Sequence, residues 1–254
     1  VITDGNGRIT RFVEKPGWGE VFSDTVNTGI YILNPDTLKF FNKNEMFDFS
    51  KDLFPILLRE KLPVYGYIAE DYWCDIGDLR AYYQAHMDAL EGKVRINIRG
   101  TRTPDGIVME EGVEIEPECV LKGPIVIGKN TKIKKGAEIE PFTILGPGNI
   151  VDEQASIKRS ITWKNCIIGK NAQVRGSILC NRVQLGDNAS TFEQSVVGDG
   201  TEIKERSIIK PNIKIWPNKS VEVGTEVNTN LVWGTKYSKL LFGHRGITGE
   251  INID

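Results

Sequence analysis

Residues whose types suit chemistry lie in three short stretches near the start of the chain. They are Phe12–Pro16 (FVEKP), Asn27–Tyr31 (NTGIY) and Tyr72–Asp78 (YWCDIGD), and they offer carboxylate, ammonium and amide groups. Taken alone, each has a structural explanation: an exposed strand end, a strand entrance, and a core tryptophan with an aspartate at a helix N-terminus. The order, spacing and residue types of the three together indicate one polar site.

The N-terminal part of the chain carries strand and helix patterns that are expected to position these stretches. Apolar, β-rich runs bounded by turn residues predict a hairpin over Val1–Val13, and strands over Val26–Leu33 and Val64–Ile68. Proline placement and apolar stripes predict helices from Pro35, over Phe49–Glu60 and over Leu79–Leu90. Strands that alternate with helices are typical of an α/β layer, here with few strands for a complete sheet.

A six-residue repeat occupies the second half of the chain. Every sixth residue from Met109 to Ile157 is large and aliphatic. The frame slips by one residue after Ile157 and again after Val174, which predicts two five-residue rungs that tighten a corner. It then continues in steps of six to Val227, with Thr191 as the one polar member. This period is neither that of an α-helix nor that of a flat strand.

A chain wound as a three-sided prism buries one residue in six, with one rung on each face. Gly and Asn residues near the corners, such as Asn130, Gly136 and Gly186, suit backbone with positive φ. The repeat predicts about six to seven coils and a length of ~30 Å. It resembles the left-handed parallel β-helix of hexapeptide-repeat proteins, from which the handedness is taken. Exposed end rungs need caps or partners, so we expect a scaffold role, including a homo-oligomer formed through the β-helix.

Hexapeptide prisms also occur in acyltransferases and zinc hydratases, whose chemistry needs histidine. The two histidines of this chain are His86 and His244, and neither lies between residues 100 and 240. The predicted prism therefore lacks a general base and metal ligands of the right type. The chain has four cysteines without a C-x-x-C pair, and we expect reduced, buried thiols.

Composition narrows the class of protein further. The 254 residues are 40% hydrophobic and 26% charged, as in ordinary folded domains. The 32 basic and 34 acidic residues give a net charge of −2, which predicts no nucleic-acid partner. No apolar run approaches the ~18 residues of a membrane span, and no signal peptide is recognisable. We therefore expect no membrane partner and a cytoplasmic location.

The three stretches, taken with the repeat, resemble one enzyme family. V-E-K-P, N-T-G-I-Y-I and Y-W-C-D-I-G-D, in this order, are similar to the second half of sugar-1-phosphate nucleotidyltransferases. The mannose-1-phosphate guanylyltransferase type, which carries a hexapeptide β-helix after its catalytic domain, matches best. The resemblance covers nearly the whole chain. It implies a partial α/β nucleotidyltransferase (Rossmann-like) domain followed by a left-handed parallel β-helix.

The resemblance also implies roles for single residues. Glu14 would bind sugar hydroxyls and Lys15 the sugar phosphate, while Asn27 and Gly29 would line the sugar pocket. Asp75 would hold Mg²⁺, the implied cofactor, and Lys15 and Asp75 would be the catalytic residues. Attack of one phosphate on another needs positive charge around both, which a lysine and a metal ion supply. Neighbours on a regular strand face opposite ways, so Glu14 and Lys15 serve one ligand only if the strand bends there.

The sequence departs from the family pattern in two places. The glycine-rich nucleotide loop of the form G-G-x-G-T-R-L is absent from this chain, and with it a cradle of backbone N–H groups for the triphosphate. Relatives commonly have Thr after D-I-G, where this chain has Asp78. Because the chain opens at Val1, we expect a fragment of a longer protein that holds the sugar half of the site and is inactive alone.

Three parts are expected along the chain. Residues 1–98 would be the C-terminal half of a nucleotidyltransferase domain, and residues 99–230 the β-helix. Residues 231–254 would be a linker and the start of a further domain, because Phe242–Gly249 (FGHRGITG) resembles the opening motif of phosphohexomutases (phosphomannomutase and phosphoglucomutase). The alternative for this stretch is a glycine-rich tail.

Two functions stay open at this point. The first is transfer of a nucleotidyl group from a nucleoside triphosphate to a hexose 1-phosphate, giving a nucleotide sugar and pyrophosphate. GTP and mannose 1-phosphate are the expected substrates, with uridylyl or adenylyl transfer to glucose 1-phosphate as a variant. The second is a non-catalytic regulatory or assembly module built on a degenerate transferase domain. The presence of Glu14, Lys15, Asn27 and Asp75 favours the first.

Overall fold

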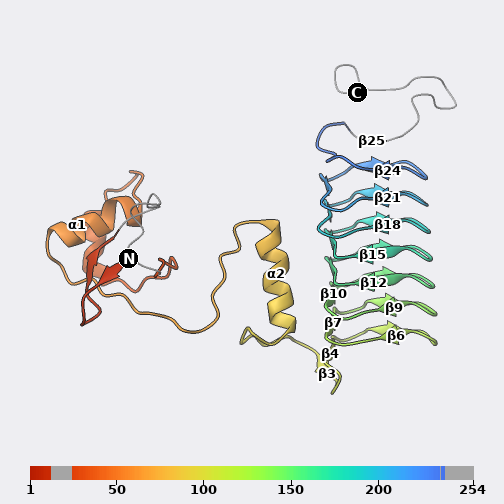
Figure 1. Cartoon of the computed structure of the whole chain (residues 1–254), viewed down its shortest axis with the longest axis horizontal. Helices are drawn as coiled ribbons and strands as arrows, with labels where there is room; N and C mark the ends of the chain where they lie inside the picture. Colours follow the sequence, from red (N-terminus) through yellow and green to blue (C-terminus); the bar gives the residue numbers. More distant parts are fainter. Residues whose placement is uncertain (13–24, 235, 238–254) are drawn as a thin grey trace. The chain divides into compact units, whose positions relative to one another are not determined.

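The computed structural model describes residues 1–12, 25–234 and 236–237 of the chain. They fall into two compact units, Val1–Asp75 (unit 1) and Ile76–Asp254 (unit 2) (Figure 1). The contacts of the folded chain group helix α2 (Leu79–Leu90) with the β-helix in unit 2. The boundary of the nucleotidyltransferase domain at residue 98 stays a prediction.

A short antiparallel hairpin opens unit 1 at the predicted place. Its strands are β1 (Ile2–Thr3) and β2 (Ile9–Arg11). The Asp4 side chain closes the turn, because its Oδ1 accepts from the backbone N–H groups of Asn6 at 2.9 Å and Arg8 at 3.0 Å. The predicted hairpin is confirmed.

Helical turns with side-chain caps follow the hairpin. They are the 3₁₀-helix η2 (Pro35–Phe40), the π-helical turn η3 (Phe49–Leu53) and the α-helix α1 (Phe54–Arg59). Asn34 and Asp48 cap η2 and η3, because their side chains accept backbone hydrogen bonds. Leu53, Phe54 and Leu57 are buried among aromatic side chains and form the core of unit 1. The predicted helices therefore exist, the first as a 3₁₀-helix.

The predicted strands over Val26–Leu33 and Val64–Ile68 are wrong for the described chain. The first segment has no regular structure, and the second makes only an isolated bridge to the hairpin. Tyr31 packs into the unit 1 core, whereas its neighbours Ile30 and Ile32 are 76% and 101% exposed. The alternation of exposed and packed side chains that is typical of a strand is therefore present. A strand also needs a neighbour to pair with, and alternation alone does not provide one.

Unit 2 contains a β-helix whose coils stack in parallel on three faces (Figure 1). Face 1 consists of β3 (Thr101–Arg102), β4 (Ile107–Met109), β7 (Ile125–Ile127), β10 (Thr143–Leu145), β13 (Ile161–Thr162), β16 (Ile178–Leu179), β19 (Val196–Val197) and β22 (Lys214–Ile215). Face 2 consists of β5 (Glu114–Ile115), β8 (Lys132–Ile133), β11 (Ile150–Val151), β14 (Ile167–Ile168), β17 (Gln184–Leu185), β20 (Glu202–Ile203), β23 (Ser220–Val221) and β25 (Lys236–Tyr237). Face 3 consists of β6 (Val120–Leu121), β9 (Glu138–Ile139), β12 (Ser156–Lys158), β15 (Gln173–Arg175), β18 (Ser190–Thr191), β21 (Ile208–Ile209) and β24 (Glu226–Val227). Only β3 pairs antiparallel to its neighbour, β4, among these strands.

The inward residue of each rung forms the core, as the repeat predicts. Six isoleucines expected there are at most 2% exposed: Ile127, Ile133, Ile139, Ile203, Ile209 and Ile215. Ile115 is 41% exposed, because it belongs to the first coil and the stack ends there. Four positions after many inward residues, a small side chain is also buried, as at Thr131, Ala137, Ala155 and Ser207. The rungs thus have a second buried position, which the six-residue period of aliphatic residues did not reveal.

Both predicted five-residue rungs are confirmed by the strand register. Ile157 pairs with Val174, and Thr162 pairs with Leu179, so each of these coils spans 17 residues and contains one rung of five residues. Both shortened rungs turn the same corner, from face 3 to face 1. None of the helices in the described part of the chain is long and apolar enough to cross a membrane.

Candidate functional site

Asn27 and Gly29 lie together in one closed loop of unit 1. The backbone N–H of Gly29 donates to Asn27 Oδ1 at 3.1 Å, and Asn27 Nδ2 donates to the Tyr31 hydroxyl at 2.6 Å. Gly29 has a φ of +74°, and a Cβ at this position would meet no atom within 4 Å. The loop therefore needs glycine for its backbone conformation and leaves open space beside it. Tyr31, four residues after Asn27, holds the Asn27 amide in place through this hydrogen bond, a contact that the sequence reasoning missed.

Glu14 and Lys15 lie outside the described residues. The bend that would turn both side chains to one ligand stays a prediction.

Asp75 lies in an irregular segment that precedes helix α2 in the sequence. Tyr72 and Trp73 belong to no strand, and Trp73 is 45% exposed instead of buried in a core. The Asp75 side chain is exposed, and no hydrogen bond or ion pair within the described ranges engages its carboxylate. None links it to Asn27 or Gly29 either. The carboxylate is thus available to a ligand.

Asp78, and not Asp75, caps helix α2. Asp78 Oδ1 accepts from the backbone N–H of Ala81 at 2.7 Å, and Asp78 has the extended backbone of an N-cap residue. The helix-capping explanation for Asp75 is therefore wrong. Threonine is also an N-cap residue, so Asp78 keeps the capping chemistry of the threonine that the resemblance leads one to expect. The signal was present in the sequence, since Asp78 directly precedes the first apolar residue of the helix.

A single exposed carboxylate fits Mg²⁺ as one of its ligands. The part of the chain that the structure describes contains no group of three or more His, Cys, Asp or Glu side chains that could enclose a metal ion. Mg²⁺ usually takes one or two carboxylates and completes its shell with water and substrate phosphates. Asp75 has the hard oxygen donors that such a site requires, and it has the access to solvent.

A shallow groove lies elsewhere, between helix α2 and a corner of the β-helix. Tyr83 and Met87 line it on the helix, and Phe142 and Arg159 line it on the corner. The described members of the predicted site, Asn27, Gly29 and Asp75, do not belong to its lining. The described part of the candidate site therefore consists of the loop at Asn27 and Gly29 and of the exposed Asp75. The groove is not part of it.

Two family models match separate parts of the chain. Residues 1–92 match the nucleotidyl transferase model, and residues 104–209 match the LbH domain of EIF2B subunit epsilon. All five predicted site residues lie inside the first match. Fold and matches together define the class: a nucleotidyl transferase domain followed by a left-handed parallel β-helix of hexapeptide repeats.

Relatives with curated functions transfer different nucleotides. The chain is 30% identical to the UTP–glucose-1-phosphate uridylyltransferase of Synechocystis sp., over 72% of this chain and 47% of that protein. It is 26% identical to the glucose-1-phosphate adenylyltransferase of Acetivibrio thermocellus, over 87% of this chain and 58% of that protein. It is 30% identical to the mannose-1-phosphate guanyltransferase of Candida albicans, over 86% of this chain and 55% of that protein.

The chain spans about half the length of these relatives. The stretch Phe242–Gly249, which resembles the opening of phosphohexomutases, lies outside the described residues and outside both family matches. A following mutase domain therefore stays a prediction.

Proposed function

We propose that the protein containing this chain transfers a nucleotidyl group from a nucleoside triphosphate to a hexose 1-phosphate. The observation that carries the proposal is the match of residues 1–92 to the nucleotidyl transferase model. Support comes from the relatives, each of which is named as a nucleotidyltransferase of a sugar 1-phosphate. The products are a nucleotide sugar and pyrophosphate.

The reaction needs charge stabilisation and alignment more than a protein nucleophile. A phosphate oxygen of the sugar 1-phosphate attacks the α-phosphorus, and the bond from that phosphorus to the pyrophosphate leaving group breaks. Lys15 is assigned to the sugar phosphate, and Glu14 to sugar hydroxyls. Bound at Asp75, Mg²⁺ supplies positive charge to the phosphates.

The loop of unit 1 would form the wall of the sugar pocket. The hydrogen bond from Asn27 Nδ2 to the Tyr31 hydroxyl fixes the Asn27 amide before any substrate binds. The open space beside Gly29 lets a ligand approach the backbone closely. A preformed wall of this kind lowers the entropy that substrate binding costs.

Mannose 1-phosphate and GTP are our proposed substrates. The guanyltransferase relative equals the uridylyltransferase relative in identity and matches more of this chain. Steady-state rates with each pairing of mannose 1-phosphate or glucose 1-phosphate with GTP, UTP or ATP will test this choice. A higher kcat/KM for glucose 1-phosphate with UTP or ATP would overturn it without affecting the class of reaction.

Substitution of Asp75 tests the site in the protein that contains this chain. Asp75→Asn keeps the size of the side chain but removes the charge that would hold Mg²⁺ between the phosphates. We expect turnover to fall about 10²-fold or more, which corresponds to ~2.7 kcal/mol of transition-state stabilisation. The measurement is Mg²⁺-dependent pyrophosphate release over a range of Mg²⁺ concentrations.

Asp78→Asn is the matched control. It removes the same charge three residues along the chain, and asparagine caps helices as well as aspartate does. We expect this variant to keep its turnover and its thermal stability. Near-normal turnover of Asp75→Asn at saturating Mg²⁺ would reject the metal-binding role of Asp75.

A further inference from the structure

The core of the β-helix is covered at its C-terminal end and open at its N-terminal end. The inward residues of β22, β23 and β24, which are Ile215, Val221 and Val227, are at most 2% exposed. In the first coil, by contrast, Ile115 is 41% exposed and Leu121 is only partly buried. Burial of apolar surface stabilises a fold, so the N-terminal end would gain stability from a cover.

The first coil also leaves one edge of face 2 unpaired. Strand β5 pairs with β8 and is the end strand of its sheet. The backbone N–H groups of Glu114 and Glu116 donate to the carbonyls of Thr131 and Ile133 in the next coil, at 3.0 Å and 2.9 Å. Backbone groups of successive strand residues point to opposite sides, so Ile115 presents its N–H and C=O to the open end. No hydrogen bond within the described ranges reaches these two groups, and such an edge can accept a further strand.

The charge of this edge restricts which strand can pair with it. Glu111, Glu114 and Glu116 are exposed along it, so the same edge of a second copy would place carboxylates against carboxylates. On the other side of β5, strand β8 shows what the edge accepts, because Lys132 Nζ lies 3.0 Å from Glu114 Oε2. We therefore expect the open side of β5 to fit a strand with basic outer residues and an apolar inner residue.

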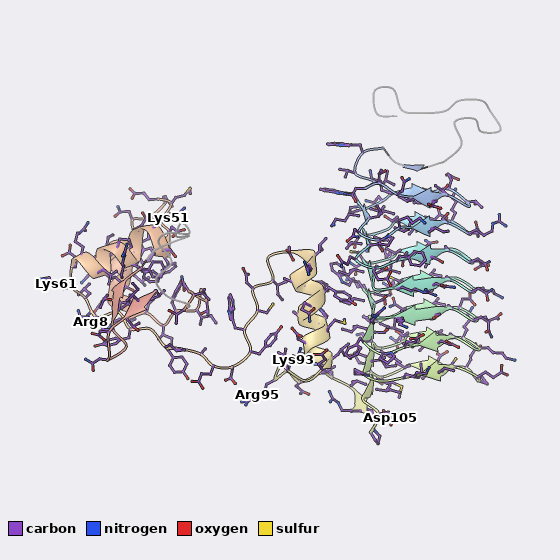
Figure 2. The ribbon with its side chains drawn as sticks, viewed as in Figure 1. Arg8, Lys51, Lys61, Lys93, Arg95 and Asp105 are labelled. Atoms are coloured by element: carbon purple, nitrogen blue, oxygen red, sulfur yellow. The ribbon has the colours of Figure 1, made fainter. Side chains whose placement is uncertain are left out.

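A segment with this pattern connects helix α2 to the β-helix. In residues 94–99 (VRINIR), aliphatic residues alternate with Arg95, Asn97 and Arg99. The segment has no regular structure, and Ile96 is 54% exposed. Figure 2 labels Arg95 on this connection, near the C-terminal end of helix α2. The segment thus offers the basic and apolar residues that the open side of β5 requires.

The segment of one copy does not lie along its own β5, because both of its ends are held on face 1. The backbone N–H of Lys93 donates to the Asp88 carbonyl at 3.0 Å, in helix α2, and this helix packs on residues of face 1. At the other end, Thr101 of β3 pairs with Met109 of β4, which also belongs to face 1. Strand β5 lies on face 2, so a second copy is the occupant that the geometry favours.

We propose that the protein containing this chain forms a two-fold dimer in which residues 94–99 of each copy add a strand to β5 of the other. In this pairing Ile96 covers the open core beside Ile115, and its two neighbours take the outer positions beside Glu114 and Glu116. Main-chain hydrogen bonds supply affinity, and the charges select the strand. The two-fold axis makes the contact twice, since each copy carries both the edge and the segment. The dimer does not depend on the proposed function.

Charge reversal on the segment tests the interface in the protein that contains this chain. Arg95→Glu combined with Arg99→Glu, the reversed variant, places carboxylates against the glutamates of β5. We expect its dissociation constant to rise roughly tenfold or more, and its mass in light scattering to fall by half at concentrations where the wild type is associated. Arg80→Glu makes the same change at an exposed position of helix α2 and should keep the wild-type mass.

A charge exchange then tests whether the two predicted strands contact each other. Glu114→Lys combined with Glu116→Lys, added to the reversed variant, places lysines against the new glutamates and should restore the wild-type mass. The ion pair of Glu114 with Lys132 is lost, but the Glu114 side chain is 65% exposed, so this loss costs little stability.

Hydrogen exchange locates the contact on the edge. The amide of Ile115 should exchange slowly in the wild type and fast in the reversed variant. The amides of Glu114 and Glu116 donate within their own β-helix, so they should stay protected in both proteins. Their protection also shows that the first coil of each variant is folded.

Any of four results would overturn the inference. One is a wild-type protein that stays monomeric up to about 100 μM. Another is an oligomer whose mass is the same in the reversed variant. The third is slow exchange at Ile115 in a monomer, because another part of the same chain then covers β5. The last is a folded charge-exchange variant that stays dissociated.

Discussion

Thr162 and Thr191 occupy the same inward position in different rungs, but their hydroxyl groups differ in hydrogen bonding. Both side chains are at most 1% exposed. Thr162 Oγ1 accepts from Asn149 Nδ2 at 2.5 Å, and Asn149 Oδ1 accepts from the backbone N–H of Cys166 at 2.7 Å. Thr191 Oγ1 has no hydrogen-bond partner in the described chain. A buried hydroxyl without a partner lowers stability, whereas a bonded one adds to it.

Replacement of each threonine by valine, which has nearly the same shape, should therefore change stability in opposite directions. Thr191→Val removes an unpaired polar group, and we expect the free energy of unfolding to rise by about 1 kcal/mol. Thr162→Val leaves the buried Asn149 amide without its acceptor and should lower that free energy by about 1–3 kcal/mol. Chemical denaturation of both variants checks the pair. A loss of stability in Thr191→Val would show that its hydroxyl is paired.

Residue types alone indicated the three polar stretches but not how each of them folds. Asn27 and Gly29 were expected in a strand and lie in a loop instead, because the Asn27 side chain accepts from the backbone N–H of Gly29 and closes a turn. Which of Asp75 and Asp78 caps helix α2 depended on where the helix starts. A capping aspartate and a ligand-binding aspartate have the same chemistry, and only the backbone geometry around them differs.

Among the elements, the rungs of the β-helix were the most predictable. A fixed period of apolar residues specifies which side chain points inward, and the two slips of that period predicted the shortened corner correctly. The aliphatic residues at outer positions of face 1, such as Ile161 and Ile178, could not be explained by the repeat. The winding of the coils does not constrain which residue types stand at outer positions. Their residue types depend on which segment covers them, here helix α2. The strand expected over Val26–Leu33 does not form for the related reason that a strand requires a neighbour to pair with.

Ile133 tests the inward register of the rungs. Its side chain is 1% exposed in β8, so Ile133→Asp would place a carboxylate among aliphatic side chains. We expect a loss of about 3–5 kcal/mol in the free energy of unfolding, measured by thermal or chemical denaturation. Gln184→Asp adds the same group at an exposed outer position of β17 and should cost less than about 1 kcal/mol. Equal effects of the two changes would contradict the register.

The stability of the whole β-helix should depend on pH through a buried thiol. Burial raises the pKa of Cys166 from 9.0 to about 11. Between these values the folded chain keeps the proton and the unfolded chain loses it, so stability falls as pH rises from 9 to 11 and is unaffected by this thiol below pH 9. The contribution of Cys166 is roughly 2–3 kcal/mol across this window.

Cys166→Val isolates this effect from other groups that titrate at alkaline pH. Val183 holds the equivalent position in the next coil, so valine fits this column of the core. We expect the stability of the variant to fall less steeply than that of the wild type between pH 9 and pH 11, and to differ from it by a constant amount below pH 9. Parallel pH profiles in denaturant-induced unfolding would contradict the shifted pKa of Cys166.

The parallel stacking of coils also affects how the chain can change in length. Each coil pairs only with the coil before it and the coil after it, through strands that lie 17 or 18 residues apart, as in Ile150–Ile167 and Lys132–Ile150. Duplication of one coil beyond β19 would therefore lengthen the stack by ~4.8 Å and leave the contacts of every other coil intact. The hydrophobic cluster that includes helix α2 takes its strand residues on the β-helix from β10 to β19, so this cluster would stay intact. This architecture should therefore tolerate best the insertion of a whole coil near the C-terminal end. It should tolerate least an insertion between residues 142 and 197.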